Sequence, residues 1–239
     1  MLLLLLSVAG YAPDVMAQQP GQLLPDLQTL PPTELSLLVT SASGKKILRL
    51  TNSIANLGPG PLELVGVSDP LDKITRVTQN IDLQNGGIEK RAAGVFIYHP
   101  THHHWHFENF VRYELWSLEA DNSLKSMVAV SDKVSYCLRD NSRAKTTPPE
   151  ARMGYIVCDQ ELQGISPGWV DTYTFDRPGQ FIDITGQPDG RYALRSIVDP
   201  ENRILELNET NNAATIYIEI SASQVRLAEL MLPRQSILE

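Results

Sequence analysis

Histidine is scarce in this sequence: five occur among 239 residues, and all five lie between His99 and His106. A Ser-His-Asp or Cys-His enzyme would have to take its histidine from this one segment. Basic residues are outnumbered as well, with 20 Lys and Arg against 28 Asp and Glu and a formal net charge of −8. This balance argues against nucleic-acid binding, which needs a basic surface. The negative net charge favours the approach of cationic partners such as amines or basic proteins.

Long hydrophobic runs are missing too. The apolar stretch at residues 2–9 is much shorter than the roughly 20 residues that a membrane-spanning helix needs. It precedes Val15-Met16-Ala17, a small-x-Ala pattern suited to signal peptidase, so we expect residues 1–19 to be a signal peptide. A plain disordered terminus is the alternative, because no Lys or Arg precedes the apolar stretch. We expect the mature protein to be secreted or periplasmic, without stable membrane insertion.

Cysteine is limited to Cys137 and Cys158. In an exported protein an even count indicates a disulfide, and closing a loop of this length would stabilise the fold by roughly 3 kcal/mol. Two buried free thiols are the alternative. A metal site made of cysteine alone is not expected, because the chain offers only two such ligands and they are far apart in sequence.

Short β-rich runs separated by turn signals fill most of the chain. Runs such as residues 111–116 and 192–198 show alternation or β-branched residues, and Gly-Pro, Asn-Gly and Asp-Gly pairs punctuate them. The pattern predicts an all-β fold, an antiparallel β-sandwich with long loops and little helix, as one domain over residues 34–220. Residues 20–33 are expected to be an extended arm. Residues 221–239 are expected to be a C-terminal tail with a short amphipathic helix over 224–232.

The histidine segment indicates a metal site. In a strand, alternate side chains share a face, so His102, His104 and His106 lie on one side. Three imidazoles suit a transition metal of the copper or zinc kind. Alternate residues of a regular strand are about 6.6 Å apart, however, so three rings converge on one ion only where the backbone bends. We therefore expect irregular backbone here, which Pro100 would help to supply. A solvated polar run with adventitious metal binding is the alternative.

Five motifs, in order over roughly residues 25–220, resemble those of the lysyl oxidase family. Each motif alone is weak, and their shared order makes the resemblance specific. They are His99-x-x-His102-x-His104-x-His106, Lys133-Val134-Ser135-Tyr136-Cys137-Leu138, the stretch from Gln163 to Tyr173 (QGISPGWVDTY), Gln180-Phe181-Ile182-Asp183-Ile184-Thr185, and Glu206-Leu207-Asn208-Glu209-Thr210-Asn211-Asn212.

The resemblance implies a copper enzyme that makes a quinone from its own side chains. Lys133 and Tyr173 match the pair that becomes lysine tyrosylquinone. No encoded side chain is an electrophilic carbonyl, and an oxidised phenol would supply one. Cys137 and Cys158 match a family disulfide that would anchor the segment bearing Lys133. The implied copper ligands are His102, His104 and His106, with His99 nearby.

The resemblance also implies a calcium site, with an Asx-rich turn as the alternative. Carboxylate and amide oxygens are suitable calcium ligands, although Asn208 stands where an acidic residue would bind better. The implied ligands are Asp26 and Leu27 of the Pro25-Asp26-Leu27 motif, together with Glu206, Asn208, Asn211 and Asn212.

The activity that the resemblance implies is copper-dependent oxidative deamination. Primary amines, either peptidyl lysine or small amines, would react with oxygen to give aldehydes, hydrogen peroxide and ammonia. Asp171, two residues before Tyr173 on the same strand face, is the candidate general base, with a structural carboxylate as the alternative. A single disulfide and a long stretch between its cysteines are more typical of microbial members than of animal ones.

Two other functions are consistent with parts of the pattern. An exported β-sandwich of adhesion or metal-handling type would keep the histidines and leave Lys133 and Tyr173 unmodified. A cupin-like oxygenase also uses His-x-His, but it needs a distant histidine that this chain lacks.

Overall fold

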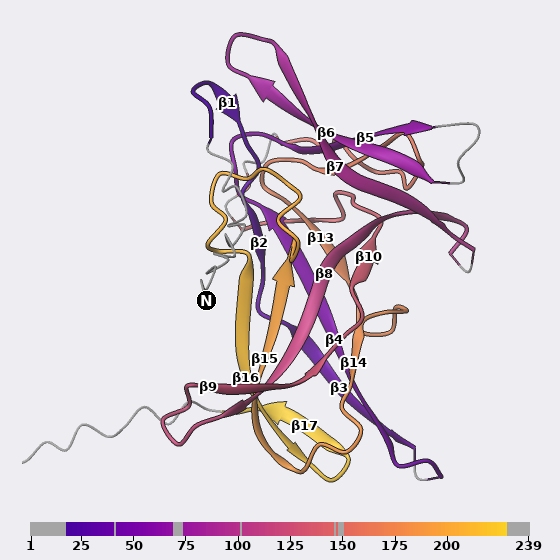
Figure 1. The fold of residues 1–239 in the computed structure, drawn as a ribbon, viewed down its shortest axis with the longest axis vertical. Helices are drawn as coiled ribbons and strands as arrows, with labels where there is room; N and C mark the ends of the chain where they lie inside the picture. The colour runs from indigo at the N-terminus through magenta and orange to yellow at the C-terminus, as the bar shows by residue number, and fades with distance from the viewer. Residues whose placement is uncertain are drawn as a thin grey trace, which may run out of the picture.

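The computed structural model of the chain describes residues 18–40, 42–68, 74–100, 102–145, 147 and 151–228. These residues form 17 strands and no helix, so the predicted all-β fold is confirmed (Figure 1). Within them, no segment has the helical length and apolarity to cross a membrane. Residues 1–17, the greater part of the predicted signal peptide, lie outside the described ranges.

Two antiparallel sheets hold all of these strands. The larger sheet consists of β1 (Gln22–Leu23), β5 (Leu62–Ser68), β6 (Thr75–Leu83), β7 (Ile88–His99), β8 (His104–Leu118), β9 (Leu124–Val130), β10 (Val134–Tyr136), β12 (Leu162–Ile165), β15 (Gly190–Val198), β16 (Ala213–Ser221) and β17 (Gln224–Leu227). The smaller sheet consists of β2 (Leu27–Thr29), β3 (Thr33–Thr40), β4 (Lys45–Asn56), β11 (Ser142–Arg143), β13 (Trp169–Tyr173) and β14 (Phe181–Asp183).

The hydrophobic core lies between the two sheets. Leu48, Leu50 and Ile54 alternate along β4, and all three are fully buried. They share one apolar cluster with Tyr113 and Leu115 of β8, on the facing sheet. Each such side chain contributes roughly 1.5–3 kcal/mol by leaving water. The period-two pattern of the sequence therefore forms a sandwich because each sheet buries one face against the other.

A polar network crosses this core and fixes β10. The hydroxyls of Tyr113 and Tyr136 are 2.9 Å apart, and Tyr113 donates to Oε1 of Gln180 at 2.6 Å. Asn52 Nδ2 donates to the Tyr136 hydroxyl at 3.2 Å. Buried polar groups need such partners. Because the network joins β4, β8, β10 and the segment before β14, it holds the end of β10 in one place.

The N-terminal arm is part of both sheets. β1 pairs with β6, and β2 pairs with β4, so the arm is extended and packed. Asn56, which is fully buried, accepts backbone N–H bonds from Asp26 at 3.1 Å and Gly58 at 3.0 Å. Its amide donates to the carbonyls of Gly60 and Ile165, each at 2.9 Å. One side chain therefore ties the arm to the sandwich.

We expect Asn56→Ala to lower the free energy of unfolding by about 2–4 kcal/mol, because it leaves buried backbone donors and acceptors without partners. Urea unfolding measures this loss. Gln84→Ala, at an exposed position, is the control and should change stability by less than about 0.5 kcal/mol. Equal losses in the two variants would contradict the role given to Asn56.

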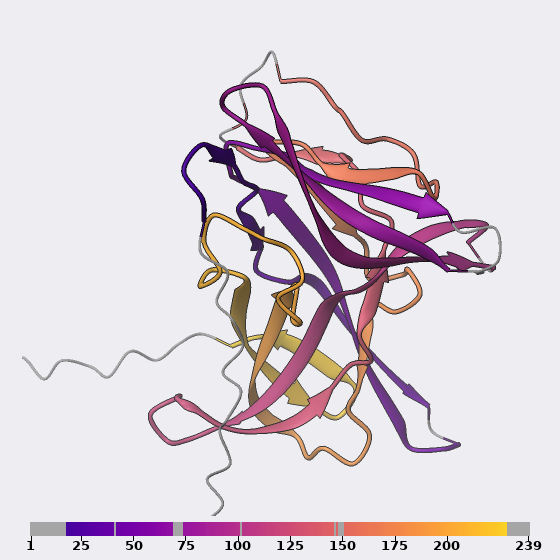
Figure 2. The same ribbon diagram turned by 45° about the horizontal axis from the view of Figure 1, so that its top comes forward.

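The larger sheet twists strongly along its length. In the view of Figure 2, β5 to β7 lie at one end of the molecule and β15 to β17 at the other, with the long strand β8 running between them. β7 and β8 form a hairpin in which His99 pairs with His104 and Ile97 with His106. The histidine segment therefore lies at the tip of this hairpin.

One predicted element is wrong in the described part of the C-terminal tail. Residues 224–227 form strand β17 against β16, where the sequence predicted helix. Val225 packs against the core, and Ala228 N–H donates to the carbonyl of Tyr217 at 2.8 Å. An open sheet edge offers backbone partners that a short amphipathic helix lacks. The rest of the predicted helix, from residue 229 onward, lies outside the described residues.

Candidate metal centre

The histidine segment contains the irregular backbone that the spacing argument predicts. The N–H groups of His102 and His103 both donate to the carbonyl of His99, at 3.0 and 2.9 Å. His103 has φ +58°, in the left-handed region. This tight turn places His102 outside β8. The regular separation of side chains along a strand therefore does not apply to His102, and its ring turns toward His104 and His106 of β8.

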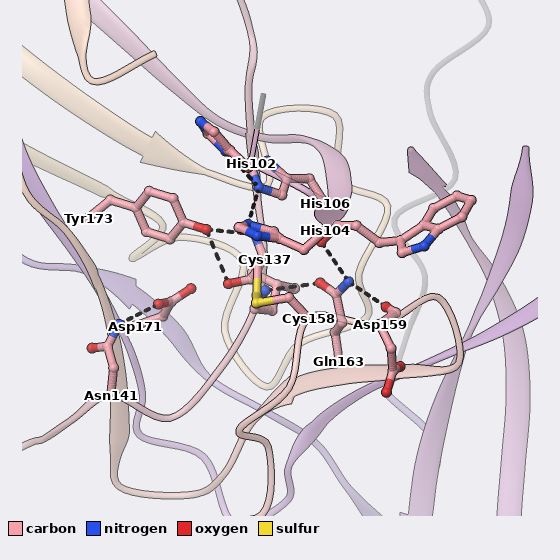
Figure 3. Close-up of a disulfide and its surroundings, with 12 residues drawn as sticks. His102, His104, His106, Cys137, Asn141, Cys158, Asp159, Gln163, Asp171 and Tyr173 are labelled. Atoms are coloured by element: carbon pink, nitrogen blue, oxygen red, sulfur yellow. Dashed lines mark hydrogen bonds between the residues drawn. A yellow bond between two sulfur atoms is a disulfide. The ribbon is translucent and has the colours of Figure 1, made fainter. Parts of the chain in front are cut away.

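Three imidazoles meet in this turn (Figure 3). Nε2 of His106 is 2.9 Å from Nε2 of His104 and 3.3 Å from Nδ1 of His102. Ligands that bind one ion at about 2.0 Å lie about 3 Å from one another. His99 stacks on His102 with ring centroids 4.3 Å apart. Ligand atoms of His99, His102 and His106 lie within 4.8 Å of one another, so four histidines gather here.

The electrostatic environment keeps these imidazoles neutral. His106 is 2% exposed, and burial lowers its pKa to about 3, with repulsion from the neighbouring histidines adding to the effect. Burial also lowers the pKa of His102 and of His104. A hydrogen bond to the backbone of Ser135 orients the His106 ring. Neutral imidazoles have lone pairs for a metal ion at neutral pH.

Tyr173 lies beside the histidines. Its hydroxyl accepts the Cys137 N–H at 2.7 Å and lies 3.3 Å from the Cys137 carbonyl (Figure 3). Its ring packs on that of Tyr136, with centroids 4.0 Å apart. Burial raises the pKa of the Tyr173 phenol, and the nearby Asp171 adds to the shift. The phenol is therefore neutral and held in a fixed position.

The predicted disulfide between Cys137 and Cys158 is present. Trp105 N–H donates to the Cys158 carbonyl at 3.0 Å. The buried Gln163 amide bonds the Trp105 and Asp159 carbonyls at 3.0 and 2.8 Å (Figure 3). These bonds join the disulfide to β8 and β12, so the covalent link contributes to positioning the histidine turn.

Lys133 and Tyr173 line two different cavities that share His102. The first has a volume of about 190 Å³ and contains Lys133 in its wall, with His99 and His106. The second has a volume of about 440 Å³ and contains Tyr173, with His104. The Lys133 ammonium makes an ion pair with Glu201, which also pairs with Arg203. The histidine cluster therefore has Lys133 on one side and Tyr173 on the other.

Asp171 is fully buried on β13 and faces neither of these two cavities. Asn141 Nδ2 donates to its Oδ1 at 2.8 Å. Burial raises the pKa of this carboxyl well above its usual range. Asp171 is close enough to Tyr173 to raise the phenol pKa. Its assignment as a general base stays a prediction.

Most of the residues expected to bind calcium come together at the end of the sandwich where the arm meets the β15–β16 loop. The Asp26 carboxylate accepts the Asn211 amide at 2.8 Å. Glu206 accepts Leu27 N–H and the Asn212 amide, each at 2.7 Å. Asn208 differs, because its Oδ1 accepts both N–H and O–H of Thr210 in a local Asx turn.

This cluster contains oxygen atoms that lack partners. Within the described chain, Oδ1 of Asn211, Oδ1 of Asn212 and Oε2 of Glu209 are buried without a hydrogen bond. Glu206 is 3% exposed, and burial raises its pKa to about 9. Unpaired buried oxygens beside a carboxyl group of raised pKa are what a bound cation would satisfy.

Four residues around the site were not found from the sequence. They are Glu201 beside Lys133, Tyr136 packed on Tyr173, and Arg139 and Arg177 in the wall of the second cavity. Tyr136 lies within the Lys133–Leu138 motif, so the sequence did indicate that it is close to the site. Nothing in the local pattern pairs Lys133 with a residue 68 positions away, or joins Arg139 to Arg177.

Comparison with known proteins gives one consistent family. Residues 71–229 match the family model described as Lysyl oxidase. The chain is 35% identical to human Lysyl oxidase homolog 1 over 139 residues, covering 58% of this chain and 23% of that protein. It is 35% identical to pig Protein-lysine 6-oxidase over 119 residues, covering 48% of this chain and 43% of that protein. The chain therefore spans less than half the length of these two relatives. The family model covers about two thirds of the chain, and the chain belongs to the lysyl oxidase family.

Proposed function

We propose that this protein oxidatively deaminates primary amines, either peptidyl lysine or small amines, to aldehydes. Oxygen is the co-substrate, and hydrogen peroxide and ammonia are the other products. The observation that carries the proposal is the convergence of three neutral imidazoles beside a half-buried tyrosine, in a chain of the lysyl oxidase family. Export to a secreted or periplasmic location is part of the proposal, since the disulfide suits an oxidising compartment.

The histidines fit a copper ion. Three nitrogen atoms, His102 Nδ1, His104 Nε2 and His106 Nε2, face one another at separations typical of ligands on one metal. Bound copper would supply the one-electron redox chemistry that oxidises a phenol, which zinc does not. His106 would be the central ligand, because it is buried and close to both of the others.

Tyr173 and Lys133 would be the precursors of lysine tyrosylquinone, whose carbonyl is the electrophile that the encoded side chains lack. Tyr173 would provide the ring, which the Cys137 backbone and the Tyr136 ring hold in place. Lys133 would provide the amine nitrogen. To bond to the ring, that nitrogen has to leave Glu201 and pass the histidine cluster. Asp171 would act on substrate as a base only after becoming accessible, and its closeness to Tyr173 keeps it the candidate.

A calcium ion would stabilise the junction between the arm and the β15–β16 loop. Asp26, Glu206, Asn211 and Asn212 would contribute side-chain oxygens, and Leu27 would act through its backbone. Asn208, with its oxygen held in a turn, would contribute only after that turn opens. The unpaired oxygens of Asn211 and Asn212 support this proposal.

We expect calcium to stabilise the protein more at pH 9 than at pH 7. A carboxyl group whose folded pKa is about 9, against 4.5 when unfolded, stabilises the fold at low pH and loses that contribution as the pH rises toward 9. Without calcium, deprotonation of the buried Glu206 carboxyl group should lower the free energy of unfolding by roughly 2 kcal/mol between pH 7 and pH 9. Urea unfolding at both pH values, with calcium or with chelator, measures the difference. A calcium effect independent of pH, or retained in Glu206→Gln, would contradict the assignment.

Peroxide release from the copper-loaded protein tests the proposed function. Aerobic turnover of a primary amine should give hydrogen peroxide and ammonia in equal amounts. Protein prepared without copper should give neither product. The exported metal-handling β-sandwich is the second candidate, favoured by the ion pair that holds Lys133 away from Tyr173. It predicts copper binding with no peroxide and no quinone stain.

A further inference from the structure

The second cavity, beside Tyr173, carries the opposite charge to the protein as a whole. Nine described residues line it, including Arg139 and Arg177, and none of them is Asp or Glu. Two guanidinium charges therefore dominate this cavity in a chain of net charge −8.

Both guanidinium groups are exposed and accessible to a ligand. Among the described residues, no ion pair or side-chain hydrogen bond involves Arg139 or Arg177. The carboxyl group that acts on Arg139 at longer range is Asp171, which is fully buried and accepts the Asn141 amide at 2.8 Å. The one that acts on Arg177 is the exposed Asp176, whose carboxylate accepts the Thr174 hydroxyl at 2.5 Å. Guanidinium groups present planar donor pairs that match a carboxylate.

The two arginines come from separate segments of the chain. Arg139 follows β10 and the disulfide cysteine, whereas Arg177 lies in the loop between β13 and β14. The fold brings both to the wall that contains Tyr173 (Figure 3 shows Tyr173, His102 and His104 on this side). An amine that reaches Tyr173 through this cavity therefore approaches two positive charges.

We propose that Arg139 and Arg177 bind a carboxylate of the substrate, so that this enzyme selects primary amines that also carry an acidic group. The inference rests on the proposed amine oxidation. A simple alkylamine enters as an ammonium ion and is repelled by both arginines, whereas a carboxylate on the same molecule cancels that repulsion. The carboxylate belongs either to a free amino acid or to an Asp or Glu beside a peptidyl lysine.

Binding to the copper-free protein tests the inference independently of turnover. The probes are 6-aminohexanoate and hexylamine, which differ in the carboxylate, titrated calorimetrically. We expect 6-aminohexanoate to bind at least about tenfold more tightly, and this preference to disappear in the Arg139→Ala/Arg177→Ala variant. Arg226→Ala, at an exposed position on β17, is the matched control. Equal binding of the two probes to the native protein would overturn the inference.

Turnover then identifies the source of the carboxylate. One pair of substrates is 6-aminohexanoate and hexylamine, and the other is acetyl-Asp-Lys-amide and acetyl-Asn-Lys-amide. The kcat/KM ratio within each pair is compared, because a loss of folded protein or of quinone lowers both members of a pair equally. Arg139→Glu/Arg177→Glu should invert whichever preference the native enzyme shows. Preferences unchanged by this double substitution would also overturn the inference. An enzyme that oxidises none of the four amines contradicts the proposed function, while the binding comparison still decides the role of the arginines.

Discussion

Replacing Tyr173 by phenylalanine is expected to abolish quinone staining of the copper-loaded protein and to lower amine oxidation by at least about 1,000-fold. Phenylalanine keeps the ring that packs on Tyr136 but has no phenol oxygen to oxidise. Because the proposed electrophile is made from this side chain, no other residue substitutes for it. Redox-cycling stain and peroxide release, both normalised to copper content, measure the effect.

The control for this experiment is Tyr98→Phe. Tyr98 is 47% exposed and packs edge-on against Trp105, on the same hairpin as the histidines. Removing its hydroxyl should leave both stain and activity close to the native level. Loss of the Cys137 N–H bond in Tyr173→Phe will cost some stability, so the comparison is made well below the unfolding temperature. A stain that persists without the Tyr173 hydroxyl would exclude this tyrosine as the precursor.

His106→Asn is expected to weaken copper binding by at least about 100-fold. His106 is the imidazole nearest to both His102 and His104, and its Nε2 is the shared point of contact. Asparagine occupies similar space near the backbone but places no nitrogen lone pair at that position. Competition with a chelator of known affinity measures the change. Amine oxidation should fall with copper occupancy.

His103→Asn is the matched control, because His103 is exposed in the same turn and outside the cluster. Asparagine tolerates the left-handed backbone at φ +58°, so the turn should survive. Copper affinity should stay within about threefold of the native value. Equal weakening in both variants would indicate that the histidine segment binds copper as a loose polar run and not as a built site.

Much of the fold is local in origin and was predictable. Alternating residues such as Leu48 and Leu50 mark a strand with a buried face, which the sandwich provides. The 224–227 strand was not predictable from its own residues, because β16 supplies the partners that select strand over helix. Strands β1 and β2, of two and three residues, are too short to carry a period and exist through pairing with β6 and β4.

The candidate site divides in the same way. The spacing of His102, His104 and His106 required a bend, and the turn at His103 provides it. Pairings between distant segments left no signal in the sequence: Lys133 with Glu201, and Arg139 with Arg177 across one cavity. Such pairings depend on how the loops pack on the two sheets, which the local sequence does not determine. The sequence therefore indicates which elements carry the chemistry more readily than it indicates what surrounds them.

Charge illustrates the difference between the whole chain and the site. The net charge of −8 favours encounter with cationic molecules. Inside the second cavity the sign is reversed, because Arg139 and Arg177 have no ion-pair partner among the described residues. The negative surface would then attract the substrate's ammonium group at long range. The two arginines would bind its carboxylate inside the cavity.

Formation of the Lys133–Tyr173 cross-link is tested most directly by mass-spectrometric peptide mapping of protein loaded with copper in air. We predict a joined pair of peptides, one containing Lys133 and the other Tyr173, which is absent when copper is omitted. Glu201 must release Lys133 for this bond to form, so the joined species should appear gradually after copper is added. Recovery of both peptides separate and unmodified, from protein that has bound copper at the histidines, would exclude this cross-link and the quinone made from it.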